Sequence, residues 1–96
     1  MKPSLALDAH REDIRRIVAE NRGLNPRVFG SALHGADAED RDLDLLIDAA
    51  DGFTLFDLPA ISVAIETLTR TRVDVGTPED LSVKFRSRIV AEAQPV

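Results

Sequence analysis

The sequence predicts one small α/β (α+β) domain, in which helices pack on a mixed, three-stranded sheet. Two observations lead to this fold class. The chain has 96 residues, of which 44% are hydrophobic, and this is enough for one core and too little for two. Its hydrophobic periodicity changes several times between helical and strand-like spacing, with turn signals between the segments. Because no repeat, low-complexity stretch or linker interrupts the chain, residues 1–96 are expected to form a single domain.

The N-terminal half is expected to form a helix followed by two strands. Residues 4–22 carry apolar side chains at helical spacing, namely Ile14, Ile17 and Val18. Asn25-Pro26 then breaks the chain, and residues 27–29 form a short strand that ends at a glycine-serine pair. After a polar connection, residues 42–48 (DLDLLID) form the second strand.

The C-terminal half is expected to add a helix, a third strand and a last helix. The first of these helices begins near Asp57, a suitable cap, and continues with apolar residues at helical spacing, namely Leu58, Ile61, Ile65 and Leu68. Residues 72–76 (RVDVG) form the third strand. Thr77, followed by a proline and two acidic residues, is typical of a helix start. The apolar residues of this last helix are Leu81, Phe85 and Ile89.

The order of these elements brings three carboxylates together. Only ten residues separate Ser31 from Asp42, which is too few for a parallel crossover, so the first two strands should be antiparallel. The long helical connection from the second strand to the third suits a right-handed crossover into a parallel neighbour. Asp42 and Asp44 then point to one face of the sheet, and Asp74 reaches the same face from the third strand. All three should converge beside the Gly30-Ser31 turn.

Clustered carboxylates repel one another and lose hydration, so they need a compensating cation. Oxygen-only ligation suits Mg²⁺ or Mn²⁺, which also leave positions for water and substrate phosphates. The backbone N–H groups near Gly30 and the hydroxyl of Ser31, with the start of a short helix, are suited to phosphate. A metal beside a phosphate site indicates nucleotide chemistry.

The pattern Gly30-Ser31, ten residues, Asp42-x-Asp44 and a later strand carboxylate at Asp74 resembles the nucleotidyltransferase superfamily typified by DNA polymerase beta. It is most similar to the minimal nucleotidyltransferase (MNT) proteins, whose ending the segment RVDVGTPEDLSVKFRSRIVAEAQPV also resembles. The resemblance implies a polymerase beta-like fold and transfer of a nucleoside monophosphate from an NTP such as ATP to a hydroxyl. It also implies two Mg²⁺ ions, with Mn²⁺ as an alternative, held by Asp42, Asp44 and Asp74, and a triphosphate held by Gly30 and Ser31.

Many minimal members of this superfamily are antitoxins paired with a HEPN-domain ribonuclease toxin, and some AMPylate a tyrosine of that toxin. The resemblance therefore implies an ATP-dependent protein adenylyltransferase with a HEPN toxin as its partner. A non-catalytic antitoxin, which neutralises its toxin by complex formation alone, remains the alternative. Two positions depart from the family pattern: His34 stands where an arginine often precedes the glycine, and Arg41 stands where a serine often precedes the first aspartate. Both bear on phosphate contacts, and neither removes a metal ligand.

Composition and spacing exclude several other classes. The net charge of −5 argues against direct nucleic-acid binding, and the absence of cysteine excludes disulfides and thiolate metal sites. No signal-peptide core or membrane span is present, so a cytoplasmic protein is expected. An EF-hand at residues 40–51 lacks the glycine and the glutamate that such a loop requires. Asp37, Glu39 and Asp40 are expected only to form a solvated acidic surface. Residues 53–56 (FTLF) are expected in the core or at the entry of a helix, with a partner-binding patch as the alternative.

Overall fold

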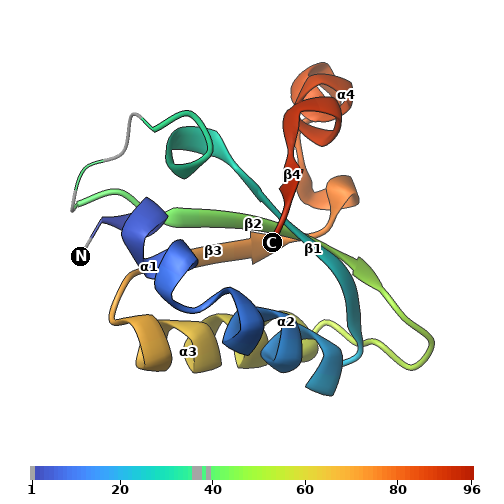
Figure 1. The fold of residues 1–96 in the computed structure, drawn as a ribbon. Coiled ribbons are helices and arrows are strands. Elements are labelled where there is room, and N and C mark those ends of the chain that lie inside the picture. The colour runs from blue at the N-terminus through green and yellow to red at the C-terminus, as the bar shows by residue number, and fades with distance from the viewer. Residues whose placement is uncertain (1, 36–37, 39) are drawn as a thin grey trace.

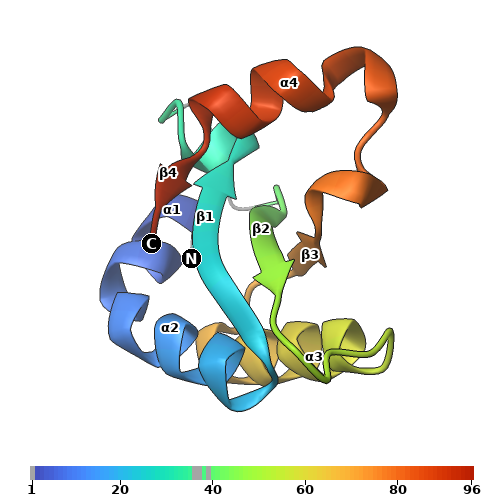
Figure 2. The same ribbon diagram turned by 90° about the vertical axis from the view of Figure 1, so that its right-hand side faces the viewer.

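The computed structural model describes residues 2–35, 38 and 40–96, and it has a four-stranded mixed sheet with helices on both sides. Figures 1 and 2 show α1, α2 and α3 on one side of the sheet and α4 on the other. The strands, in the spatial order β3-β2-β1-β4, are β3 Val73–Gly76, β2 Leu43–Ala49, β1 Gly23–Phe29 and β4 Gln94–Pro95. The helices are α1 Pro3–Ala9, α2 Arg11–Glu20, α3 Asp57–Thr69 and α4 Val83–Glu92, with two 3₁₀ turns, η1 Gly30–Ala32 and η2 Pro78–Asp80. The α+β class expected from the sequence is therefore confirmed.

The strand directions are also those expected from the lengths of the connections. Strands β1 and β2 are antiparallel, and β2 and β3 are parallel neighbours joined by α3. The side chains of β2 alternate between the two faces of the sheet. Leu43, Leu45 and Ile47 are fully buried in the core that the sheet forms with α2 and α3. The alternate residues of the same segment, Asp42 and Asp44, therefore lie on the opposite face of the sheet.

The prediction of three strands was wrong, because the structure adds β4. This strand pairs antiparallel with β1 through Arg27 and Val28, and the N–H of Val96 donates to the carbonyl oxygen of Pro26 at 2.9 Å. Val96 itself is buried in the core. A strand of two residues, one of them proline, has no periodicity that the sequence could reveal.

Three element boundaries also differ from the prediction. The expected first helix is broken at His10, whose φ of −132° is not helical, so α1 and α2 are separate. Strand β1 begins at Gly23 and passes through the expected break, because Asn25 adopts a φ of +51° at an irregularity in the pairing with β2. Thr77 caps η2 instead of α4, and its N–H donates to Asp80 Oδ2 at 2.8 Å.

The segment 53–56 divides between core and surface. Phe53 packs against the core, whereas Leu55 and Phe56 are 81% and 85% exposed and lie outside it. Phe56 directly precedes α3, in agreement with the expected helix entry. Within the described part of the chain, none of the helices is long and apolar enough to cross a membrane.

Candidate functional site

The site begins at the turn that ends β1. Gly30 has a φ of +75°, and a Cβ atom built on it would collide with the carboxylate of Asp44. This close approach follows from the register, because Phe29 lies opposite Asp44 across the β1–β2 pair. The position therefore needs glycine both for its backbone conformation and for the space beside the carboxylate. Ser31 follows in η1, the short helical turn that the sequence predicted here.

The three predicted carboxylates lie on two neighbouring parallel strands. Asp44 is directly opposite Asp74 in the β2–β3 register, so both side chains project from the same face of the sheet. Asp42 immediately precedes β2. The structure thus places all five predicted site residues, Gly30 and Ser31 included, around one end of the sheet.

Electrostatic strain is concentrated on Asp44. Partial burial, followed by repulsion from Asp74 and Asp42, raises its pKa to about 6. An ordinary aspartate is fully ionised at neutral pH, whereas this one retains a proton on an appreciable fraction of molecules. A cation bound beside Asp44 would relieve this strain.

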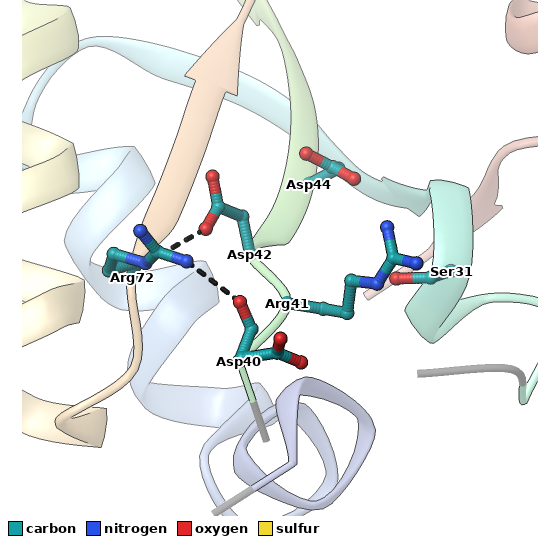
Figure 3. A pocket seen from close by; sticks show the side chains of 6 residues that line it. All are labelled: Ser31, Asp40, Arg41, Asp42, Asp44 and Arg72. Carbon is teal, nitrogen blue, oxygen red and sulfur yellow. Dashed lines mark hydrogen bonds and ion pairs between the residues drawn. The ribbon is translucent and has the colours of Figure 1, made fainter. Parts of the chain in front are cut away.

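A polar pocket of about 360 Å³ opens beside these carboxylates. Figure 3 shows the side chains that line it, which are Ser31, Asp40, Arg41, Asp42, Asp44 and Arg72. Two of them are exposed arginines, so the pocket combines carboxylates for a cation with guanidinium groups for phosphate. Arg41, one of the two departures from the family pattern, and Arg72 both lie on the pocket wall.

Arg72 contacts two other residues that line this pocket, Asp42 and Asp40. Its Nε lies 3.1 Å from Asp42 Oδ1, and its Nη2 donates to the carbonyl oxygen of Asp40 at 2.7 Å. The sequence did not predict this pairing with Asp42. The position of Arg72 in the sequence could have indicated the pairing. Arg72 directly precedes β3, and the β2–β3 register sets it beside Asp42, which directly precedes β2.

A second pocket, of about 330 Å³, is bordered by Asp74. Asp74, Thr77 and Asp80 line it together with six apolar side chains, namely Phe29, Leu45, Leu46, Leu58, Val75 and Leu81. Asp74 thus borders this pocket and Asp44 borders the polar one. Leu46 carries the sequence signal for this pocket, because it is the apolar residue that follows Asp42 and Asp44 on their own face of β2.

The donor chemistry at this site fits a divalent cation, because Asp42, Asp44 and Asp74 offer only carboxylate oxygens and one of them has a raised pKa. Among the described residues, however, no three His, Cys, Asp or Glu side chains are grouped so that they could hold a metal ion as they stand. His34 points its Nε2 to within 3.7 Å of Glu92 Oε2. Asp37 and Glu39, expected to be solvated, lie outside the described residues.

In a comparison with protein families, the model of the nucleotidyltransferase domain matches residues 10–96. The chain is also similar to a Methanocaldococcus jannaschii protein named "Putative protein adenylyltransferase MJ0435". The two are 30% identical over 69 residues, which are 72% of this chain and 74% of that protein.

Solved structures of similar fold include one described as a "putative minimal nucleotidyltransferase". It has a TM-score of 0.85 and 35% identity, and the match covers 97% of this chain and 95% of that one. A toxin-antitoxin structure with AMP-PNP has a TM-score of 0.72 at 17% identity, covering 88% of this chain and 69% of that one. A Shewanella oneidensis complex of a tri-AMPylated HEPN toxin with an MNT antitoxin has a TM-score of 0.67 at 16% identity, covering 92% and 69%. These last two likenesses concern the fold.

Proposed function

Because the chain belongs to the nucleotidyltransferase domain family, we propose that it transfers AMP from ATP to a hydroxyl group of a partner protein. The acceptor we propose is a tyrosine of a HEPN ribonuclease toxin, which the transfer inactivates. In this proposal residues 1–96 act in the cytoplasm as the antitoxin of a HEPN/MNT pair. Support for the partner comes from two solved structures that share this fold, a toxin-antitoxin structure with AMP-PNP and a complex of a HEPN toxin with an MNT antitoxin.

The observation that carries the proposal is the position of Asp44 opposite Asp74, next to the Gly30-Ser31 turn. Two carboxylates on adjacent parallel strands repel each other, and a fold has little reason to keep them together unless a cation or a reacting group lies between them. The glycine turn next to them lets the Asp44 carboxylate approach the backbone closely, because a side chain at Gly30 would collide with it.

The polar pocket suits the triphosphate. The hydroxyl of Ser31, the N–H groups of η1 and the guanidinium groups of Arg41 and Arg72 supply donors for phosphate oxygens on one wall. Asp42, Asp44 and Asp74 would hold two Mg²⁺ or Mn²⁺ ions, which supply charge stabilisation for the attacking and leaving oxygens when bound. In this proposal the α-phosphate would lie near Asp44 and Asp74, which are directly opposite each other on β2 and β3.

Asp74 is placed to receive the acceptor. It is exposed, whereas Asp44 is half-buried, so an external hydroxyl reaches Asp74 first. In an in-line displacement the acceptor oxygen bonds to the α-phosphorus as the bond to pyrophosphate breaks on the opposite side. With pyrophosphate on the Ser31 side, the acceptor approaches from the Asp74 side, and Asp74 takes up the hydroxyl proton and passes it to water.

The test is AMP transfer by an Asp74→Asn variant. This variant removes the charge at nearly constant volume, so it should fold, bind the toxin, and lose about 100-fold or more of its transfer rate. The purified toxin is incubated with ATP and Mg²⁺, and intact mass spectrometry counts each added nucleotide. Glu79→Gln is the matched control, because it removes a nearby exposed carboxylate that lines neither pocket.

Two outcomes would contradict the proposal. One is an Asp74→Asn protein that transfers AMP as fast as the Glu79→Gln control. The other is a wild-type protein that neutralises the toxin at equal stoichiometry while the mass of the toxin stays unchanged. The second result would establish the non-catalytic antitoxin instead.

A further inference from the structure

Arg72 forms an ion pair, through its guanidinium group, with Asp42, one of the three site carboxylates. Its guanidinium contacts Asp42 at 3.1 Å and the Asp40 carbonyl oxygen at 2.7 Å, so two of its nitrogen atoms are engaged on the segment that precedes β2. Figure 3 shows both contacts and shows Asp44 lying apart from them. Asp42 is therefore directed to Arg72 in this structure.

The three site carboxylates differ in their partners. Asp44 and Asp74 are held in register by the parallel strands, and their side chains interact electrostatically. Asp42 precedes the strand, and its carboxylate is bound to the guanidinium. Among the described residues, Asp42 thus differs from Asp44 and Asp74 in having a cationic partner, Arg72, on the protein itself.

We propose that Arg72 is an internal counter-ion, which occupies Asp42 while no nucleotide is bound and moves to the phosphates when nucleotide and metal bind together. This inference rests on the proposed function, which brings a divalent cation and a triphosphate to the same pocket. A guanidinium group binds carboxylate and phosphate with the same planar pair of N–H donors. Asp42 lines the same pocket as Ser31, whose hydroxyl is proposed to bind phosphate, and Arg72 lines that pocket as well.

The exchange requires little energy because the pair is exposed. Arg72 retains 72% of its side-chain exposure and Asp42 retains 45%, so water and salt screen their attraction. An ion pair of this kind changes an affinity by about two- to fivefold. The consequence is a site that binds the cation weakly when alone and more tightly when ATP removes Arg72 from Asp42.

Titration of the purified protein with Mn²⁺, followed by the EPR signal of the free ion, tests the first half of this inference. Without nucleotide, Arg72→Gln should bind Mn²⁺ about two- to fivefold more tightly than the wild type. Arg41→Gln is the matched control, because it removes an equal charge from the same pocket and has no ion pair with Asp42 among the contacts described. An equal gain in Arg41→Gln, or no gain in Arg72→Gln, would overturn the inference.

The second half concerns the nucleotide. In the presence of Mn²⁺, Arg72→Gln should bind ATP at least about twofold more weakly than the wild type, by calorimetry, because a phosphate contact is lost. In an Asp42→Asn background, Arg72→Gln should give no further gain in Mn²⁺ affinity. Unchanged ATP affinity, or a full gain in that background, would also overturn the inference. All these measurements are of binding, so a wild-type protein that binds Mn²⁺ and ATP yet transfers no AMP would contradict only the proposed function.

Discussion

Asp44 lies where burial and two neighbouring carboxylates act in the same direction. Both effects raise its pKa, which reaches about 6, so the folded protein resists ionisation of this group more than the unfolded chain does. A raised carboxylate pKa means that folding is favoured while the group is protonated. The stability that this gives is present at low pH and is lost as the pH rises through the ordinary aspartate pKa towards 6.

We therefore expect Asp44→Asn to stabilise the protein above pH 6 in the presence of EDTA. The unscreened pKa difference corresponds to about 3 kcal/mol, and because Asp44 is only half-buried, solvent screening reduces the expected gain to on the order of 1 kcal/mol. Urea unfolding at pH 7.5 and at pH 4 measures the difference between variant and wild type. The gain should be present at pH 7.5 and disappear at pH 4.

Asp48→Asn provides the control on the same strand. Asp48 accepts a hydrogen bond from Arg27 at 2.7 Å, so its charge is paired and removing it should not stabilise the protein at either pH. Equal stabilisation by the two substitutions would show that the general acidity of the chain, rather than the cluster around Asp44, causes the effect.

The sequence predicted that Gly30, Ser31, Asp42, Asp44 and Asp74 meet, since strand alternation and connection length decide this. Their roles in binding and catalysis stay predictions. The Arg72–Asp42 contact was not predictable in the same way, because it depends on which rotamer of a long side chain is adopted beside a particular carboxylate.

Helix α4 has none of its residues among the buried ones, so its attachment depends on contacts at its ends. Arg86 donates through Nε to the Pro78 carbonyl oxygen at 2.8 Å, and through Nη2 to the carbonyl oxygens of Glu79 and Leu81 at 3.1 Å each. These bonds connect α4 to η2, which follows the strand that carries Asp74. At its other end, α4 continues into β4, which pairs with β1.

Arg86→Gln should loosen α4 and η2 locally and leave the sheet intact. Loss of charge-assisted hydrogen bonds to backbone carbonyls should lower the free energy of local opening by about 1–2 kcal/mol. Amide hydrogen exchange in residues 78–92 should then be about five- to thirtyfold faster, while β2 exchanges as in the wild type. Arg88→Gln is the control, because this arginine stacks over the Phe85 ring at 5.2 Å and is exposed. Unchanged exchange in Arg86→Gln would show that β4 alone holds the helix.

Some helices and strands could be predicted from the sequence and others could not, for physical reasons. Long periodic segments such as α3 were recognised because many residues contribute to one signal. The break at His10 interrupts a pattern that is compatible with one continuous helix, and β1 extends through Asn25 because asparagine tolerates a positive φ. Tertiary pairing with β1, which local sequence does not encode, produces β4.

The molecule as a whole has an excess of negative charge, with 17 acidic and 12 basic residues. A Mn²⁺ or Mg²⁺ ion that binds the folded state and not the unfolded chain should stabilise the folded state. At a concentration ten times the dissociation constant, the gain is about 1.4 kcal/mol, or roughly 5–10 °C in Tm for a domain of this size. Asp42→Asn/Asp44→Asn should lose this response in differential scanning calorimetry.

The matched control for this measurement is Asp48→Asn/Asp51→Asn, which removes the same charge away from the carboxylate cluster and should keep the metal response. A metal-induced increase in Tm that is equal in wild type and in Asp42→Asn/Asp44→Asn would assign the stabilisation to general charge screening. The site among Asp42, Asp44 and Asp74 would then be wrong.

The pairing of Asp44 with Asp74 across β2 and β3 also has a consequence for biosynthesis. The two carboxylates belong to strands separated by the whole of α3, so they meet only after a long stretch of chain has been closed. Parallel pairing of this kind forms slowly compared with a local hairpin. During translation, β1, β2 and the glycine turn leave the ribosome well before β3, and the third carboxylate arrives last. A nascent chain therefore acquires its complete set of acidic groups only once residues beyond Asp74 have emerged, so an incomplete translation product that ends before β3 cannot carry out the proposed transfer.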